Sequence, residues 1–258
     1  MIETRKSILS IETATPVCSV ALRLPDGRVY EKRKEGKGVH SELTFVFIEE
    51  LLREHKLEVR ELGAMIISAG PGSYTGLRVA SSAAKGLLFE TGIPLFACHT
   101  LGSFAMGARE LLMKNTKGSM AVEDSNYGLK TDYENNLTDF AGCDCVIDAR
   151  RNHLYHQTWR FVENGIVPLS EVVVREIPEV LDRWNSGCLL VGTGVDRIRR
   201  AAEARALPTE KLPMLSEADV VGAGHILCAL GRISQNHLEK LIKKVAPEHF
   251  EPYYYSGL

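Results

Sequence analysis

Two acidic residues stand at equivalent places in the sequence, where they could meet a substrate or a metal ion. Glu12 ends the apolar stretch 7–12, and Asp148 ends a similar stretch, 144–148. Short apolar runs that are followed by turn residues are typical of buried β-strands. After each acid come a turn, a second strand, an Asp-Gly or Asn-Gly hairpin and a third strand. The repeated order indicates two halves related by duplication, each with one acid at the end of its first strand.

A glycine-rich turn over residues 69–72 joins a predicted strand to a helix that Ser73 or Thr75 can cap. The first N–H groups of a helix bind phosphate readily, and the candidate cofactor-binding residues at the two turns are Glu12, Thr13 and Ser73. The Walker pattern and the dinucleotide fingerprint are both absent. Because glycine's permissive backbone already explains a tight turn and close packing, the residues imply no cofactor firmly.

The histidines are spaced poorly for a metal site. His40 and His55 lie at opposite ends of one predicted helix, and His99 is alone. His153 and His156 are three residues apart in a predicted strand, and this spacing places their side chains on opposite faces. No G-x-S-x-G elbow is present either. The sequence therefore predicts neither a metal site nor catalytic residues.

The composition is that of an ordinary globular protein. The 258 residues are 45% hydrophobic and carry a net charge of -2, so no overall positive field attracts nucleic acid. No apolar run reaches the ~20 residues of a membrane span, and the start has no signal-peptide pattern. Six cysteines without a C-x-x-C pair favour reduced thiols. We expect a cytoplasmic protein with no membrane partner, which alone does not bind nucleic acid tightly.

Two predicted helices have unusual surfaces. The helix over 40–55 carries apolar side chains around about half of its circumference, more than the stripe of ~100° on an ordinary surface helix. The helix that follows residue 72 has a face of small residues at helical spacing. Either both helices are enclosed within their own domain, or they dock against another chain.

The predicted elements divide the chain into two halves and a tail. The first half covers 1–102, and the second, shorter half covers 103–217 and includes a polar insertion, 114–142. A long helix over 218–240 can pack back on the first half, and the tail is 241–258. Each half has a three-stranded meander followed by helix, strand and helix, the order of the duplicated actin and sugar-kinase architecture. In that α/β fold the cleft between the halves holds a nucleotide, so we expect both acids to face it.

Four segments together resemble the TsaB (YeaZ) family of bacterial proteins. They are ILSIETATPVCSVAL, HSELTFVFIEELL, SAGPGSYTGLRVASSAAKGLLFETGIPLFACHTL and VIDARRNHLY. The resemblance is close from Ile8 to Ser103 and again from Val146 to Tyr155. The segment GPGSYTGLR is its most specific element.

The resemblance implies an actin-like (ASKHA, ribonuclease H-like) fold with a reduced second half. It also implies a non-catalytic partner of the TsaD threonylcarbamoyltransferase, which forms threonylcarbamoyladenosine (t6A) at position 37 of tRNAs reading ANN codons. A TsaE-like ATPase would join the complex, tRNA would be met only through the complex, and ATP or ADP would be bound only there. The isolated chain would form a homodimer. Partner and homodimer would both dock on the two helices described above. The interface residues that the resemblance implies are Leu43, Phe47 and Leu51 on the first helix and Gly76, Ala80 and Ala83 on the second.

The sequence departs from the family pattern in three places. Glu12 stands where many relatives have Asp, the insertion 114–142 is long, and the tail over 252–256 lacks an expected arginine. An alternative function is a small-molecule kinase or other nucleotide-binding enzyme of the same superfold, with phosphate-binding turns at 13–15 and 192–194. Against it, the first turn lacks the glycine that lets backbone amides approach a phosphate.

Overall fold

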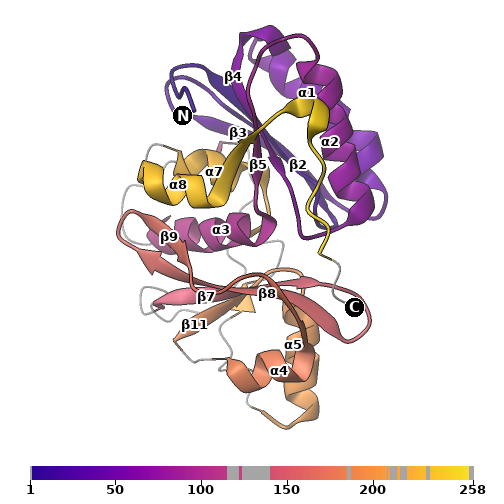
Figure 1. Cartoon of the computed structure of the whole chain (residues 1–258), viewed down its shortest axis with the longest axis vertical. Helices are drawn as coiled ribbons and strands as arrows, with labels where there is room; N and C mark the ends of the chain where they lie inside the picture. Colours follow the sequence, from indigo (N-terminus) through magenta and orange to yellow (C-terminus); the bar gives the residue numbers. More distant parts are fainter. Residues whose placement is uncertain are drawn as a thin grey trace.

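The computed structural model describes residues 2–114, 122–123, 140–184, 187–207, 209, 214–215, 220–230 and 233–255. It contains two sheets, and three layers of helices cover their faces (Figure 1). Within the described residues, no helix combines the length and the hydropathy that a membrane span requires.

The first sheet has strand order β13-β5-β4-β1-β2-β3-β6. Its strands are β1 (Ser7–Glu12), β2 (Val17–Arg23), β3 (Val29–Glu35), β4 (Leu62–Ser68), β5 (Leu95–Cys98), β6 (Val122–Glu123) and β13 (Ile242–Val245). The first three strands form the predicted antiparallel meander. Its hairpin turns at Gly27, whose φ of 93° is the left-handed conformation that glycine adopts without strain. β4 and β5 then continue in parallel beside β1.

The second sheet repeats this arrangement. Its main order is β10-β8-β7-β11-β12, and β9 pairs with β8. Its strands are β7 (Gly142–Asp148), β8 (His153–Val162), β9 (Gly165–Pro168), β10 (Val173–Glu176), β11 (Cys188–Val191) and β12 (Met214–Leu215). β7 pairs antiparallel with β8 and parallel with β11, as β1 pairs with β2 and β4. The duplicated actin-like fold with a reduced second half is therefore confirmed.

The helices cover both sheets on both faces. They are α1 (Val39–Glu54), α2 (Tyr74–Leu88), α3 (Thr100–Lys114), α4 (Ile177–Arg183), α5 (Val195–Ala204), α7 (Ala223–Ala229) and α8 (Gln235–Leu241), with short 3-10 turns at Val59–Glu61 and Pro247–His249. α1 and α2 cover the outer face of the first sheet, and α4 and α5 cover the outer face of the second. α3 and α7 lie between the sheets, where one buried cluster joins both halves (Figure 1).

The single helix predicted over 218–240 is wrong. Within the described part of that segment there are two short helices, α7 and α8, with extended backbone at Leu230 and Ser234 between them. Ser234 is the N-cap residue of α8, and serine is favoured at helix starts and disfavoured within helices. α7 packs against β1 and β2 of the first sheet. Most of the predicted insertion 114–142 lies outside the described residues.

The C-terminal segment connects the two halves. After β13 it runs along α2, and the Tyr253 N–H donates to the Ala69 carbonyl oxygen at 2.6 Å. The Tyr255 hydroxyl lies 3.0 Å from Nε2 of His99, which follows β5. The Tyr155 hydroxyl of β8 donates to the Tyr255 carbonyl oxygen at 3.4 Å. One tyrosine of the tail thus contacts both halves.

Candidate functional site

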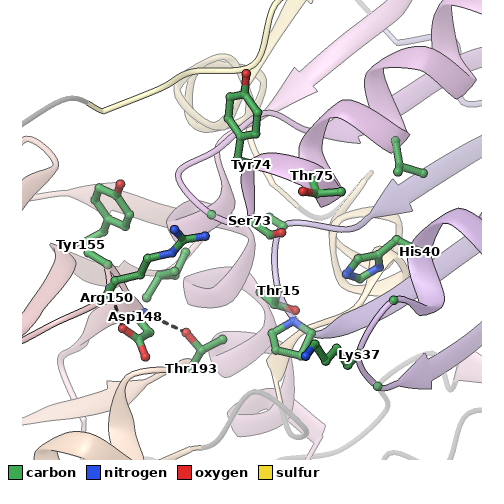
Figure 2. A pocket seen from close by; sticks show the side chains of 18 of the residues that line it. Thr15, Lys37, His40, Ser73, Tyr74, Thr75, Asp148, Arg150, Tyr155 and Thr193 are labelled. Atoms are coloured by element: carbon green, nitrogen blue, oxygen red, sulfur yellow. Dashed lines mark hydrogen bonds between the residues drawn. The ribbon is translucent and has the colours of Figure 1, made fainter.

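A cavity of about 910 Å³ opens between the two halves (Figure 2). Its walls are the turn between β1 and β2, the starts of α1 and α2, and the turn between β7 and β8. These are the places where the duplicated fold brings its loops together. Of the three candidate cofactor-binding residues, Ser73 lines the cavity, whereas Glu12 and Thr13 are not among the residues that form its walls.

The two acids at the strand ends have different environments. Asp148 lines the cavity, and its carboxylate accepts a hydrogen bond from the Arg150 N–H at 2.8 Å and pairs with the Arg197 guanidinium. Glu12 is 3% exposed, and its Oε1 accepts a hydrogen bond from the Ala14 N–H at 2.7 Å. The expectation that both acids face the cleft is thus wrong for Glu12, because its side chain folds back beneath the turn that follows it.

Burial also changes the acidity of Glu12. Loss of solvent raises the pKa of the Glu12 carboxyl from 4.5 to about 7, although hydrogen bonds from Ala14 and Ser68 oppose the shift. A carboxyl in such a position holds its proton in the folded protein at a pH where the unfolded chain has lost it. Glu12 is therefore a buried structural acid with an unusual proton affinity.

The free energy of unfolding is expected to fall by roughly 3 kcal/mol as the pH rises from 4.5 to 7 because of Glu12 alone. In this window the folded state binds the additional proton, so raising the pH favours unfolding, and the effect levels off above the folded pKa of about 7. Glu12→Gln keeps the oxygen that Ala14 contacts but cannot ionise. Urea unfolding at pH 5 and pH 8 should therefore show a smaller loss of stability in the variant than in the wild type. Parallel losses in both proteins would contradict this account.

The turn between β1 and β2 is closed by the chain itself. The Ser73 N–H donates to the Ala14 carbonyl oxygen at 2.7 Å, and the Thr13 hydroxyl donates to the Gly76 carbonyl oxygen at 2.7 Å. A Cβ atom placed on Gly72 or Gly76 would come closer than 3.0 Å to the backbone of this turn. The glycines therefore allow the start of α2 to pack against the turn. The N–H groups of Thr13 and Ala14 in this turn already donate to the Ser68 hydroxyl and to the Glu12 carboxylate.

The predicted interface residues divide into buried and half-buried groups. Leu51, Ala80 and Ala83 are at most 1% exposed and belong to the core between the helices and the first sheet. Gly76 is also buried. Leu43 and Phe47 are half-buried. Of the six predicted interface residues, Leu43 and Phe47 therefore have side chains that are partly exposed to solvent, and the other four are buried.

Two apolar residues of α1 that are outside the predicted interface set are more exposed than any residue in that set. On α1, Phe45 is 52% exposed and Val46 is 42% exposed. Successive residues of a helix turn by roughly 100°, so Leu43, Val46 and Phe47 lie on one part of the solvent-exposed side of α1 and Phe45 lies at its other edge. We call this exposed side of the helix, with its four apolar side chains, the α1 outer face. Phe45 belongs to the broad apolar arc that the sequence shows for this helix. The packing of α1 on β2 decides which side chains of that arc are buried and which face solvent.

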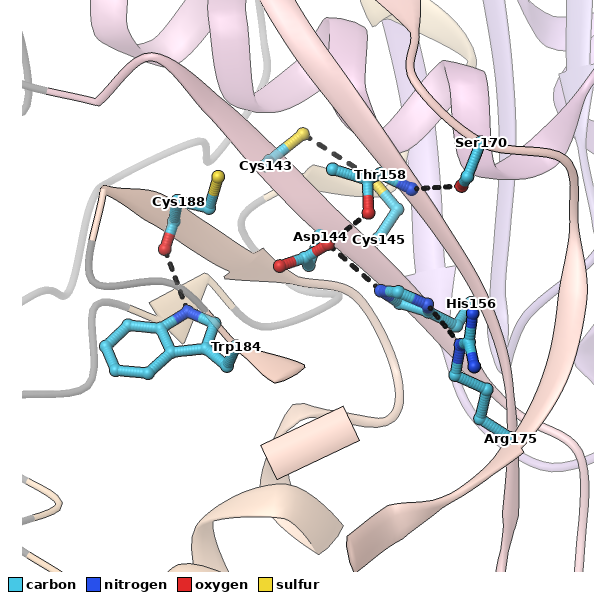
Figure 3. Close-up of polar contacts among 9 residues, drawn as sticks. All are labelled: Cys143, Asp144, Cys145, His156, Thr158, Ser170, Arg175, Trp184 and Cys188. Carbon is cyan, nitrogen blue, oxygen red and sulfur yellow. Dashed lines mark hydrogen bonds and ion pairs between the residues drawn. The ribbon is translucent and has the colours of Figure 1, made fainter. Parts of the chain in front are cut away.

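A second group of titratable residues lies in the sheet of the second half (Figure 3). The Asp144 carboxylate accepts a hydrogen bond from the Thr158 hydroxyl at 2.6 Å and lies 3.0 Å from Nε2 of His156. Arg175 Nε donates to His156 Nδ1 at 3.3 Å, which leaves Nε2 to donate to Asp144. The group joins β7, β8 and β10, and its members satisfy one another. We interpret it as a buried network that fixes strand register.

Two buried cysteines lie next to this network in β7. Cys143 and Cys145 are buried, with their Sγ atoms 3.6 Å apart, and loss of solvent raises the pKa of the Cys143 thiol well above its ordinary value. A raised pKa keeps the thiol protonated and unreactive. Within the described residues, no cluster of three or more histidine, cysteine and acidic side chains has metal-binding geometry.

Comparison with known proteins places these features in context. The family model for TsaD, tRNA N6-adenosine threonylcarbamoyltransferase, matches residues 34–117. The chain is 32% identical over 105 residues to the tRNA threonylcarbamoyladenosine biosynthesis protein TsaB of Haemophilus influenzae, a match that spans 41% of this chain and 44% of that protein. It is 30% identical over 190 residues to TsaB of Bacillus subtilis, spanning 72% of this chain and 70% of that protein.

The fold also matches a solved structure. YeaZ from Pseudomonas aeruginosa aligns with a TM-score of 0.71 and 21% identity, covering 97% of this chain and 100% of that one. At this identity the likeness establishes the fold alone. It agrees with the two-sheet architecture described above.

Proposed function

The chain belongs to the TsaB family of tRNA threonylcarbamoyladenosine biosynthesis proteins, and on this premise we propose that it is a non-catalytic subunit in the formation of t6A. Its part in t6A biosynthesis follows from the family. The finer proposal is that it binds and activates a TsaD-family threonylcarbamoyltransferase that modifies position 37 of tRNAs reading ANN codons. A TsaE-like ATPase joins this complex, and the isolated chain forms a homodimer.

The observation that carries the non-catalytic role is the closed turn between β1 and β2. In this fold the turn would have to offer free backbone N–H groups to a phosphate. Here the start of α2 is packed against the turn through Ser73 and Gly76. Glu12, the acid of the first half, is buried away from the cavity. The chain therefore lacks in its first half the arrangement that a phosphotransferase of this architecture needs.

The α1 outer face is the surface we assign to the partner. Phe45 and Val46 are exposed on a helix whose opposite side is already packed on the first sheet. Aromatic side chains in the centre of an interface contribute much of its binding energy. The position of this face is fixed by the core below it. That core includes Leu51, Ala80 and Ala83, which pack α1 and α2 against the first sheet.

A small-molecule kinase is the second candidate function. The cavity between the halves favours it, and the closed turn opposes it. Isothermal titration with ATP and magnesium, followed by an assay for ADP, distinguishes the two functions. Steady ATP turnover by the isolated chain would support the kinase, whereas binding without turnover is compatible with the t6A subunit.

The proposal is tested by co-purification with a TsaD-family subunit, together with a tRNA mobility shift. We expect the tagged chain to retain the TsaD-family subunit, and we expect the isolated chain to leave tRNA unshifted at physiological salt, because its net charge is only -2. Failure to retain the subunit, or a submicromolar shift by the chain alone, would contradict the proposed role.

A further inference from the structure

The end of the C-terminal tail passes from the first half of the molecule to the second. Phe250 is 4% exposed and belongs to the core between the first sheet and the helices α1 and α2, so it anchors this segment in the first half. Figure 1 shows the residues that follow, in yellow, running beside α2 towards the second half. They belong to no strand or helix, so their course is determined by the contacts of their own side chains and backbone.

Two tyrosines hold the segment against the start of α2. A Cβ atom placed on Gly70 would come within 2.5 Å of the Tyr253 carbonyl oxygen, so the backbone of the tail packs directly on the glycine-rich turn. The ring of Tyr254 lies 5.0 Å from that of Tyr74, measured between centroids. Arg78 Nε donates to the Tyr254 hydroxyl at 3.3 Å. The segment is therefore fastened to the first half up to this residue.

Tyr255 continues the segment to the second half. Its hydroxyl lies 3.0 Å from Nε2 of His99, and the two rings meet edge to face. On the second half, the Tyr155 hydroxyl donates to the Tyr255 carbonyl oxygen at 3.4 Å, and the two ring centroids are 6.1 Å apart. Tyr155 lines the cavity between the halves, as Tyr74 does in the first half (Figure 2). The segment therefore contacts one lining residue of the cavity in each half.

The halves are joined in a second region as well, between the two sheets. There α3 packs against β8 and β9, α8 packs against β9, and α3 and α7 share a buried cluster with both sheets (Figure 1). Among the residues that the structure describes, those that line the cavity belong to none of these three helices. Two domains that are joined in one region can rotate about it as about a hinge. A further connection beside the cavity restricts this rotation.

We propose that the segment 250–255 is a strap that holds the two halves at one angle and thereby sets the opening of the cavity between them. When Tyr255 leaves its place between His99 and Tyr155, the halves rotate apart about the helices between the sheets. Burial lowers the pKa of the His99 ring to about 4, so at neutral pH its contact with Tyr255 joins uncharged groups. Such hydrogen bonds are individually weak, so the strap can release while both halves stay folded.

This inference goes beyond the proposed function and does not depend on it. The strap lies beside α2 and the cavity, and none of its contacts described above involves the α1 outer face. The angle between the halves is measured on the isolated chain, whereas the proposed function is measured by capture of a TsaD-family subunit. Each proposal can therefore fail without the other.

The test measures the distance between the halves by double electron–electron resonance on the full chain. Spin labels are attached through Ser41→Cys in the first half and Asn152→Cys in the second, both at exposed positions. Cys188→Ser removes a half-buried native thiol, and the other five cysteines are buried. The labelled chain is mixed with an excess of unlabelled chain, so that only distances within one chain are recorded.

We expect a single narrow distance distribution for the chain with its native strap, and a longer and broader one for Tyr255→Ala. Tyr155→Phe removes only the hydroxyl that donates to Tyr255, so it should cause a smaller change in the same direction. Added to Tyr255→Ala it should cause no further change, because both substitutions act on one contact. The matched control is Phe89→Ala, which removes a ring that is 74% exposed at the end of α2. This control should leave the distribution unchanged.

Hydrogen exchange at the Tyr253 amide shows separately whether the strap is in place. This N–H donates to the Ala69 carbonyl oxygen, so it should exchange slowly in the wild type and at least about tenfold faster in Tyr255→Ala. An unchanged distance distribution in Tyr255→Ala would overturn the proposal, whether or not exchange at Tyr253 had increased. Unprotected exchange at Tyr253 in the wild type, or an equal broadening caused by Phe89→Ala, would also overturn it.

Discussion

Replacing Phe45 by Asp is expected to leave the chain folded and to weaken its capture of a TsaD-family subunit by at least about tenfold. Phe45 is 52% exposed, so a charge at this position is solvated in the isolated chain. In a complex the same charge would be removed from water without a partner, which is costly. Titration of the TsaD-family subunit against the immobilised chain measures the loss, and circular dichroism checks the fold.

The matched control is Leu169→Asp. Leu169 is 50% exposed and lies in the second half, away from α1, so this variant adds the same charge at a similar exposed apolar position. It should retain wild-type affinity. Leu51→Asp is unsuitable as an interface test, because Leu51 is 1% exposed within the core and its replacement would unfold the domain. Unchanged affinity in the Phe45 variant would contradict the assignment of the α1 outer face.

Gly76→Ala is expected to lower the free energy of unfolding by several kcal/mol, whereas Gly86→Ala in the same helix should raise it by up to about 1 kcal/mol. A Cβ atom on Gly76 would collide with the carbonyl oxygen of Thr13, and backbone atoms cannot move aside as a flexible side chain does. At Gly86 no atom lies within 4 Å of the added carbon. Alanine there gains only the higher helix propensity.

Urea unfolding of the two alanine variants beside the wild type measures this contrast. Because both substitutions make the same chemical change in α2, their difference reports the packing of the helix start against the turn after β1. Similar stabilities for the two variants would mean that the turn is not closed as described. The non-catalytic role, which rests on the closed turn between β1 and β2, would then lack its main structural support.

The duplicated architecture could be predicted because its signals are local. Hairpin glycines such as Gly27 and apolar strands ending at Glu12 and Asp148 occur in the same order in both halves. The glycine-rich turn before α2 was open to two interpretations, close packing or phosphate binding. The contacts of Gly72 and Gly76 with the turn after β1 favour close packing, and this answer depends on residues about 60 positions apart.

The exposure of individual side chains depends on tertiary contacts, which cannot be predicted from the periodicity of the sequence. The apolar arc of α1 includes both Leu51, which faces the sheet, and Phe45, which faces solvent. Glu12 has the sequence position of a cleft residue, but the backbone N–H of Ala14 turns its carboxylate inwards.

The most direct measurement is the amount of t6A formed on tRNA by a reconstituted mixture of the TsaD-family subunit, the TsaE-like ATPase and a threonylcarbamoyl donor. The account predicts abundant t6A with the wild-type chain, little with the Phe45→Asp chain, little when the chain is omitted, and none when it is the only protein present. Undiminished t6A in the mixture that lacks this chain, or t6A made by this chain alone, would contradict the account.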